Sequence, residues 1–362
     1  MKKLLILYTS VGEGHKKIAE NLGVLLENDY ETDLCDVLRL EKGTLVDSGT
    51  GLYLWILKHT PWLWNFFYTN KLFLTLTLPL RVPVAGRKSK KILELIRSKN
   101  YDIVLTTQVN PSAVVSYLKK KKLFRGKFII AFSDYHLHPY WVFKNADLFL
   151  ANIKEQKEQM ISMGVTSSKI AVCGMTLKPL SVLDTQPIKN KFNLLPGEKT
   201  VLFLGGSLGI YISSDEIEVI RGENIKIIIV CGKNSVLREI LKNKFQNCAD
   251  IVVLGYVKDM EELYAIADLV VSKPGGLTVA ECIRRGLPMQ INAYMPGQEK
   301  LNYEYLIRKR LVMPLVPDLP SKIAGELRTW DFKMQLGNNP AVKEILKNGT
   351  EIKSALRNCE TV

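Results

Sequence analysis

The chain has few of the features that build cross-links or metal centres. Its 362 residues include six scattered cysteines, and none of them forms a C-x-x-C pair. Several cysteines fall in or beside apolar runs, where a free thiol packs as a small hydrophobic group. This pattern argues against a disulfide framework, predicts no metal site and suits a reducing cytoplasm.

Long hydrophobic runs are also absent. The apolar segment at 44–80 is interrupted by Lys58, Pro61, Asn65 and Lys71, so no run reaches the ~20 residues that span a bilayer. The apolar stretch that follows Lys3 is shorter than the core of a signal peptide. We therefore expect neither a transmembrane segment nor a signal peptide.

Acidic residues are scarce in one block of the chain. Residues 51–127 contain 15 Lys and Arg but only Glu94 and Asp102, a local balance of 15 − 2 = +13 out of the net +14. This block indicates an anionic partner. It overlaps the aromatic side chains Trp55, Trp62, Trp64, Phe66 and Phe67.

Indole rings flanked by basic residues favour a peripheral segment at an anionic membrane surface. The alternative is an amphipathic helical hairpin packed on a sheet. A nucleic-acid interface fits less well, because the aromatic residues form an apolar segment rather than isolated stacking platforms.

The remaining pattern is that of a soluble α/β protein with two domains. Strands are predicted at 4–8, 31–37, 101–106, 127–133, 147–151 and 169–173, and again at 200–204, 225–231, 251–254, 269–271 and 287–291. Helical patterns separate them, which predicts two doubly wound, Rossmann-like sheets facing a cleft. We expect domains at 1–175 and 200–339, a linker at 176–199, and a last helix, about 340–362, that is a candidate to return to the first domain.

The most informative stretch is a strand, a glycine turn and a helix. Gly275 and Gly276 follow the strand at 269–271 and precede a helical pattern that ends before Gly286. Without Cβ atoms the turn lets backbone approach a ligand, and the helix start offers N–H groups to an anion. Glu281 lies one turn into the helix, where its carboxylate could reach sugar hydroxyls. An ordinary βα turn remains the alternative.

Further polar turns follow other strands. Gly12-Glu13-Gly14-His15 lacks the third glycine of a dinucleotide fingerprint, but His15 is a candidate general base at a helix start. A structural histidine is equally compatible with this position. In Ser133-Asp134-x-x-x-His138-x-x-Trp141, Asp134 could instead cap a helix, and His138 suits a functional or a structural role. The run 119–122 reads as a solvated charge cluster.

Taken together these residues resemble the glycosyltransferases that build glycolipids on diacylglycerol, the monogalactosyldiacylglycerol synthases and processive diacylglycerol glucosyltransferases of family 28. The resemblance covers nearly the whole chain. It rests on the two motifs above, on Cys231-Gly232-Lys233-Asn234, on Gly255-Tyr256-Val257, on Lys273-Pro274-Gly275-Gly276-Leu277-Thr278-x-x-Glu281 and on Pro296-Gly297-Gln298-Glu299-x-x-Asn302.

The resemblance implies a GT-B fold and inverting, metal-independent transfer of a hexose from a UDP-sugar, which is a substrate rather than a cofactor. The implied UDP-sugar contacts are Gly14, Gly205, Gly206, Ser207, Cys231, Gly232, Asn234, Gly255, Tyr256, Val257, Lys273, Pro274, Gly275, Gly276, Leu277, Thr278, Glu281, Pro296, Gly297, Gln298, Glu299 and Asn302. Within this set, Tyr256 and Val257 would flank uracil, Glu281 would hold the ribose, and Gln298 and Glu299 the donor sugar.

Catalytic candidates are His15, His138 and Asp47, the last a rival base in the region that corresponds to the family's lipid-binding part. The acceptor and membrane side would include Asp134 and Trp141 with the aromatic residues Trp55, Trp62, Trp64, Phe66 and Phe67. The implied location is the cytoplasmic face of the membrane, with diacylglycerol as acceptor and no nucleic acid as partner.

Three alternatives stay open. One is transfer of N-acetylglucosamine to a polyprenyl-linked acceptor, and another is a UDP-sugar 2-epimerase of the same architecture. The third is a membrane-surface binding protein with a decayed site, against which the intact His15, Glu281 and Gln298 argue. The glycine-rich loop at 205–209 is less polar than the resemblance leads us to expect.

Overall fold

The computed structural model describes residues 1–10, 13–40, 59–86, 89–221, 224–315, 336, 339–347 and 349–361. The chain divides into two compact units. The first comprises Met1–Pro179, Met295–Asn302 and Glu344–Val362, and the second comprises Leu180–Tyr294 and Tyr303–Lys343. Each unit has its own sheet and its own hydrophobic core.

The sheet of the first unit has six strands in the order β2-β1-β3-β4-β5-β6, and every pairing is parallel. Its strands are β1 (Lys2–Tyr8), β2 (Tyr30–Asp36), β3 (Ile103–Thr106), β4 (Lys127–Ala131), β5 (Leu148–Ala151) and β6 (Ile170–Val172). The centre of β1, Leu4 to Leu7, is buried. Continuous apolar strands of this kind are covered on both faces, as parallel sheets are.

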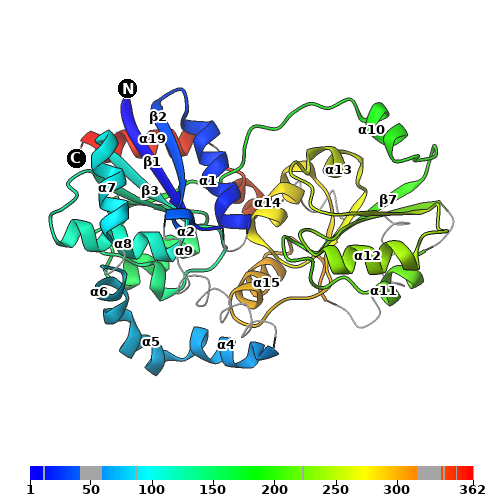
Figure 1. Cartoon of the computed structure of the whole chain (residues 1–362), viewed down its shortest axis with the longest axis horizontal. Coiled ribbons are helices and arrows are strands. Elements are labelled where there is room, and N and C mark those ends of the chain that lie inside the picture. The colour runs from blue at the N-terminus through cyan, green and yellow to red at the C-terminus, as the bar shows by residue number, and fades with distance from the viewer. Residues whose placement is uncertain are drawn as a thin grey trace. The chain divides into compact units, whose positions relative to one another are not determined.

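Helices and short 3₁₀ turns connect these strands (Figure 1). They are α1 (Glu13–Leu26), α2 (Val37–Leu40), α4 (Pro61–Thr69), α5 (Lys71–Thr77), η1 (Leu78–Leu80), α6 (Arg81–Gly86), α7 (Ser89–Lys99), α8 (Val109–Lys120), η2 (Pro139–Trp141), α9 (Lys154–Ser162), η3 (Ser167–Lys169) and α19 (Gly349–Thr361). Helix α1 buries Ile18, Leu22 and Leu26 on one face, which is the face that the apolar periodicity predicts.

The aromatic segment continues the first unit as a row of short helices, α4, α5 and α6, with α6 against α8 (Figure 1). Pro61 opens α4, where the missing N–H is not needed. Asn70 caps α5 by accepting a hydrogen bond from the N–H of Phe73. Among the described residues, no helix has both the length and the apolar character needed to cross a membrane.

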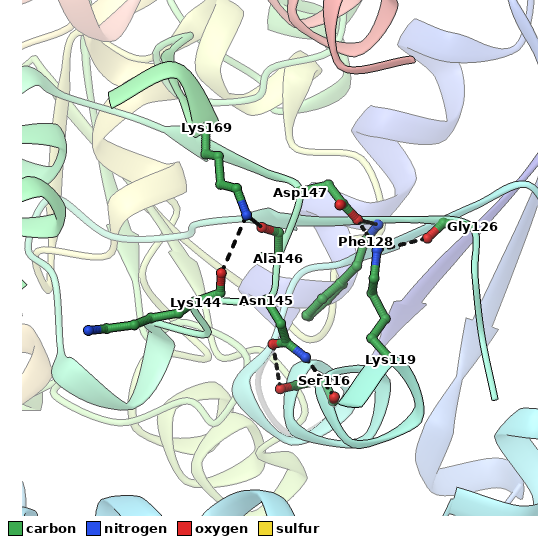
Figure 2. A network of polar contacts seen from close by, with 9 residues as sticks. All are labelled: Ser116, Lys119, Gly126, Phe128, Lys144, Asn145, Ala146, Asp147 and Lys169. Carbon is green, nitrogen blue, oxygen red and sulfur yellow. Dashed lines mark hydrogen bonds and ion pairs between the residues drawn. The ribbon is translucent and has the colours of Figure 1, made fainter. Parts of the chain in front are cut away.

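A network at the amino ends of β4 and β5 fixes α8 to the sheet (Figure 2). Asp147 accepts hydrogen bonds from the Lys119 ammonium and from the N–H of Phe128 (2.7 Å). Lys119 also donates to the carbonyl of Gly126 at 3.0 Å. The run 119–122 was expected to be solvated, and this is wrong for Lys119, because Asp147 lies within reach of its ammonium group.

The second unit has a five-stranded parallel sheet in the order β11-β10-β7-β8-β9. The strands are β7 (Lys199–Leu204), β8 (Ile225–Val230), β9 (Ile251–Leu254), β10 (Leu269–Ser272) and β11 (Met289–Ile291). The strands predicted in both halves are confirmed, with ends that differ by a few residues.

The helices of the second half are α10 (Thr185–Lys191), α11 (Ser214–Ile220), α12 (Ser235–Lys244), α13 (Glu261–Ile266), α14 (Gly276–Arg285), α15 (Gln298–Arg308) and α18 (Pro340–Ile345). Helix α10 lies inside the stretch expected to be a linker, and Asp184 caps it. Gly286 ends α14 in the left-handed conformation with φ of 63°, which a residue without Cβ adopts at little cost. The first turns of α15 belong to the first unit and its remainder to the second.

The described residues at the end of the chain form two helices where the sequence predicts one over about 340–362. Helix α18 stops at Ile345 and α19 begins at Gly349, where a Cβ would lie only 2.7 Å from the Leu25 side chain. Helix α19 is tied to the first unit through Glu360, which accepts hydrogen bonds from Lys2 (2.5 Å) and from the Tyr30 hydroxyl (2.6 Å). Helix α19 contacts β5 and β6, and its first residue lies near Leu25 of α1.

Candidate functional site

Both sheets place the first strand of their unit in the interior. Strand β1 lies between β2 and β3, and β7 lies between β8 and β10. In each unit the chain first builds the sheet on one side of that strand and then crosses to the other side. Loops on the two sides diverge at such a point, and parallel α/β sheets bind ligands there, beyond the carboxyl ends of the strands.

In the second unit, two glycine-rich loops are packed backbone against backbone. A Cβ on Gly209 would lie 2.1 Å from the carbonyl oxygen of Cys231, and one on Gly232 would lie 2.2 Å from that of Gly206. Both glycines have positive φ, 58° and 57°. Only glycine fits at these positions, so the loops after β7 and β8 depend on it.

Polar side chains hold the same loops. The amide of Asn234 caps α12 by accepting from the N–H of Leu237 (2.9 Å), and it donates to the carbonyl of Gly209 (3.1 Å). The N–H of Lys233 donates to the carbonyl of Ser207 at 3.0 Å. Burial raises the pKa of the Cys231 thiol to about 11, so this sulfur is a packing group at neutral pH.

The loop after β9 presents an aromatic ring. Tyr256 is 46% exposed, and the Lys233 ammonium lies 5.4 Å from its ring centroid. Gly255 and Val257, on either side of it, are half-buried. An accessible phenol ring beside a glycine loop is a surface on which a planar base can stack.

The turn between β10 and α14 has the geometry of an anion-binding helix start. Ser272 fixes it by donating to the carbonyl of Leu204 at 2.9 Å, and no side chain caps α14 at Gly275. A Cβ on Gly275 would make only an ordinary 3.7 Å contact with Thr278, and its φ of −71° suits any residue. The fold itself therefore does not demand glycine at 275.

The other members of this turn lie around it. Lys273 is next to Gly206, since a Cβ there would meet its side chain at 3.1 Å. Pro274 and Gly276 are buried, whereas Leu277 and Thr278 are half-buried on the first turn of α14. The loops after β7, β8 and β10 thus converge at one edge of the sheet.

Glu281 has a partner that the sequence did not reveal. The buried Tyr264 hydroxyl, from α13, donates to the Glu281 carboxylate at 3.1 Å. Arg285 lies over the Tyr264 ring and also 3.5 Å from Glu261. Burial raises the pKa of Tyr264 well above its ordinary value, and the Glu281 charge adds to the rise, so the phenol stays protonated and holds the carboxylate in one orientation.

In the first unit, His15 lies at the divergence of β1 and β3. The Thr107 hydroxyl, just after β3, donates to the His15 carbonyl at 2.9 Å, and the imidazole centroid is 6.0 Å from that of Trp141. Its Nδ1 is buried and has no hydrogen-bond partner among the described residues. Burial lowers the pKa of His15, although the Asp134 carboxylate and a backbone hydrogen bond with Thr107 oppose this shift. A neutral imidazole with an unused nitrogen is suited to accept a proton.

Asp134 is a buried carboxylate that three side chains hold. Its Oδ2 accepts from Gln298 (2.7 Å) and Ser133 (2.9 Å), and its Oδ1 accepts from Asn302 (2.8 Å). Burial raises the pKa of Asp134, but the His136 imidazole and the Gln298 and Asn302 amides more than offset it, so the pKa is lowered. Asp134 is therefore an anion at neutral pH, in electrostatic range of His15.

His138, in the loop after β4, differs from His15 because both of its ring nitrogens have hydrogen-bond partners. The Nε2 of His138 lies 2.8 Å from the carbonyl of Tyr68 and must donate to it, while its Nδ1 accepts from the N–H of Tyr140. Burial lowers the pKa of His138 to about 4. This geometry favours a structural role for a neutral His138, which holds α4 through the Tyr68 carbonyl, over the role of proton acceptor that the sequence allowed.

His136 was not among the sequence candidates, yet it lies between two of their segments. Its Nε2 is 2.7 Å from the Tyr68 hydroxyl and its Nδ1 is 3.1 Å from Oδ1 of Asn302. No local pattern marks this residue, because its partners are 68 and 166 positions away in the chain.

The motif at 296–302 belongs to the first unit. Gly297 has φ of 91° and faces the rings of Trp64 and Tyr68, with Nε1 of Trp64 3.3 Å from where its Cβ would be. Glu299 accepts from the N–H of Met295 at 2.9 Å, and Pro296 is half-buried. Asn302 is 1% exposed and forms hydrogen bonds with Asp134, Tyr135 and His136. These hydrogen bonds join the start of α15 to the loop after β4 within the first unit.

The short helices carry an exposed apolar stripe. Trp62 and Phe66 on α4 are 68% and 48% exposed, and along α5 to α6 every fourth residue is exposed as well: Leu72, Leu76, Leu80 and Val84. Trp64 and Phe67 point to partners instead, Trp64 to Tyr68 and Phe67 to Phe73. Side chains four apart share one face of a helix, so Leu72, Leu76, Leu80 and Val84 form a row of exposed apolar side chains along α5 to α6.

Basic residues near the stripe are not all available to a partner. Arg81 donates to the carbonyls of Pro139 (2.9 Å) and Val142 and lies 4.1 Å from the Phe143 ring centroid. Burial lowers its pKa to about 10. Exposed members of the basic block are Lys71, Lys90, Lys91, Arg97, Lys99, Lys120, Lys121, Lys122 and Arg125. Arg87, Lys88, Asp47, Trp55 and Gly12 lie outside the described residues.

Known proteins resemble the chain along most of its length. The sequence profile described as Monogalactosyldiacylglycerol (MGDG) synthase matches residues 15–177, and the one described as Glycosyltransferase family 28 C-terminal domain matches residues 200–298. A processive diacylglycerol beta-glucosyltransferase from Bacillus subtilis is 28% identical over 316 residues, 84% of this chain and 81% of that protein. One of the same name from Bacillus thuringiensis is 27% identical and covers 95% of this chain and 90% of that protein.

Solved structures share the fold at low identity. A UDP-N-acetylglucosamine 2-epimerase has a TM-score of 0.59 with 12% identity, covering 98% of this chain and 95% of that one. The Anabaena protein HepE, solved with UDP and glucose, has a TM-score of 0.54 with 13% identity over 100% and 99% of the two chains. With two parallel α/β units of the GT-B type and both family profiles matched in order, the chain belongs to glycosyltransferase family 28 and is related to the diacylglycerol glucosyltransferases.

Proposed function

We propose that this enzyme transfers a hexose from a UDP-sugar to diacylglycerol at a membrane surface, with inversion at the anomeric carbon and without a bound metal ion. The observation that carries the proposal is the convergence of the glycine-rich loops after β7, β8 and β10 at the start of α14. Backbone N–H groups at such an edge suit a diphosphate. The names of the relatives favour glucose as the sugar.

The donor would be held mainly by the second unit. The diphosphate would lie over Gly206, Gly275 and Gly276, uracil would stack on the exposed ring of Tyr256, and Glu281 would accept from the ribose hydroxyls. As the sugar leaves, negative charge grows on the diphosphate. The positive end of the α14 dipole stabilises that charge. Gln298 and Glu299 remain the candidates for contacts with the donor sugar.

His15 would act as the base. Its neutral imidazole takes the proton of the acceptor hydroxyl while the hydroxyl oxygen attacks the anomeric carbon from the face opposite UDP, and the bond to the diphosphate oxygen breaks. The imidazolium that forms is stabilised by the buried Asp134 anion, which interacts electrostatically with His15. Asp47 stays a rival base.

The acceptor side would use the apolar stripe. Burying a fully exposed leucine side chain is worth about 1.5–3 kcal/mol, and each basic residue near an anionic surface adds about 1 kcal/mol. Both contributions, apolar burial and electrostatic attraction, are available from the exposed side chains of Leu72, Leu76 and Leu80 and from Lys71 beside them. A peripheral attachment of this kind would keep diacylglycerol, which does not leave the bilayer, within reach.

An assay with vesicles tests the function. Vesicles of diacylglycerol and phosphatidylglycerol are incubated with UDP-glucose, UDP-galactose or UDP-N-acetylglucosamine in the presence of EDTA, and lipids are resolved by mass. We expect one UDP-sugar to give a β-linked glycolipid. Conversion of UDP-N-acetylglucosamine to its 2-epimer with no lipid product, or transfer only to a polyprenyl phosphate acceptor, would contradict the proposal.

Replacing His15 tests the base. His15→Ala should lower turnover by roughly 10²–10⁴-fold, because the attacking hydroxyl loses its proton acceptor, while UDP affinity stays unchanged. Since only the neutral imidazole accepts a proton and burial lowers the pKa of His15, the wild-type rate should fall on the acid side with a midpoint below pH ~6.5. Full activity of His15→Ala would show that this histidine is structural.

A charge in the stripe tests membrane attachment. Leu76→Asp should weaken cosedimentation with anionic vesicles by about tenfold or more, because a carboxylate replaces a side chain that would enter the lipid. Val219→Asp on α11 is the matched control, since Val219 and Leu76 are both 64% exposed. Equal binding of both variants would exclude the stripe as the attachment surface.

A further inference from the structure

The tautomer of His136 can be read from its neighbours. Oδ1 of Asn302 accepts from the N–H of Tyr135 at 2.9 Å, which fixes the orientation of the amide. The oxygen carries no proton, so Nδ1 of His136, 3.1 Å away, must donate to it. In the neutral ring Nε2 is then the acceptor, and it receives the Tyr68 hydroxyl proton at 2.7 Å.

One end of this chain of hydrogen bonds is the buried carboxylate. Asn302 donates through Nδ2 to Asp134 and accepts through Oδ1 from two donors, one of them His136. Without the imidazole, Oδ1 of Asn302 loses one of the donors that fix the orientation of the amide. Asp134, which also accepts a hydrogen bond from Gln298, would then lose the fixed position of the Asn302 amide beside it.

The other end is the helix that carries part of the apolar stripe. Tyr68 lies in the last turn of α4, on which Trp62 and Phe66 are exposed large apolar residues. Its ring is also 5.7 Å from that of Trp64, and both rings face the backbone of Gly297. Helix α4 is therefore joined to the 295–302 segment in two ways. Trp64 and Tyr68 face Gly297 directly, and the Tyr68 hydroxyl reaches Asn302 through His136.

We propose that His136 is a positioning residue for transfer: its Nδ1–H tautomer couples α4, through the Tyr68 hydroxyl, to Asn302 and hence to Asp134 and Gln298. The proposal rests on the transferase activity proposed above. Neither ring nitrogen is assigned to substrate. The role is to keep the carboxylate beside His15, and the start of α15, in one arrangement when α4 is at the membrane.

Three variants test the coupling. Tyr68→Phe removes only the hydroxyl that His136 accepts. His136→Asn keeps a donor near the position of Nδ1 but has no group at the position of Nε2. Tyr140→Phe is the matched control, because its hydroxyl also joins the loop after β4 to the short helices, through Thr77 on α5, but it does not lead to Asn302.

We expect Tyr68→Phe and His136→Asn each to lower kcat on diacylglycerol vesicles by about three- to tenfold. The double variant should lose no more than either single one, since both break the same link. UDP affinity should match wild type, the thermal midpoint should shift only slightly, and Tyr140→Phe should keep kcat within about twofold.

Three results would overturn the coupling: a loss of kcat in the double variant equal to the product of the single losses, a loss in Tyr140→Phe as large as in Tyr68→Phe, or wild-type kcat in Tyr68→Phe. If wild type transfers no sugar, the proposed function fails rather than this inference. In that case the thermal midpoints of wild type, Tyr68→Phe, His136→Asn and the double variant still test the link. Coupled groups are expected to give non-additive shifts, and additive shifts would refute the coupling.

Discussion

Close contact between bare backbone segments at the carboxyl edge of β7 is the constraint on which the rest of the structure depends. Gly209 against Cys231, and Gly232 against Gly206, leave no room for a single side-chain carbon. The loops after β7 and β8 therefore lie flat against one another, and the β10 turn joins them through Ser272. A surface of N–H groups and glycine can approach a diphosphate more closely than a surface of side chains.

The carboxyl edge of the sheet in the first unit is built around a buried carboxylate rather than around glycine-rich loops. This edge has few glycines in the described part and instead buries a carboxylate, Asp134, with three donors. An unpaired buried charge would be costly, and these donors make it tolerable. The result is a fixed anion near a neutral imidazole. The second unit thus presents the start of α14 beside glycine-rich loops, and the first unit presents a buried carboxylate near the His15 imidazole.

Much of this was predictable because it is local. Buried parallel strands are continuous apolar runs, so all eleven strands could be placed from the sequence, and a strand followed by Gly275-Gly276 and a helical pattern specified the α14 turn. The family resemblance rested on the same local motifs. The sequence does not show that Gly349, at the start of α19, lies against Leu25, because the two residues are far apart in the chain.

Tertiary pairing was not predictable from spacing. The Asp134 contacts with Gln298 and Asn302 join residues 164 and 168 apart, and the resemblance implied that both amides contact the UDP-sugar. Lys119 belonged to a charge run on any local reading, yet Asp147 pairs with it. His136, Tyr68 and Tyr264 carry no motif at all. In each case a polar side chain is identified only by the partner that the fold brings to it.

The central claim is that the backbone at the β10–α14 turn holds a diphosphate, and calorimetry on Gly275→Ala tests it directly. The fold accepts a Cβ there, so the variant should keep the thermal midpoint of wild type. UDP binding should weaken by about tenfold or more, because the added methyl group occupies the space of a phosphate oxygen, while uridine binding should not change. Unaltered UDP affinity, or equal losses for UDP and uridine, would contradict the account.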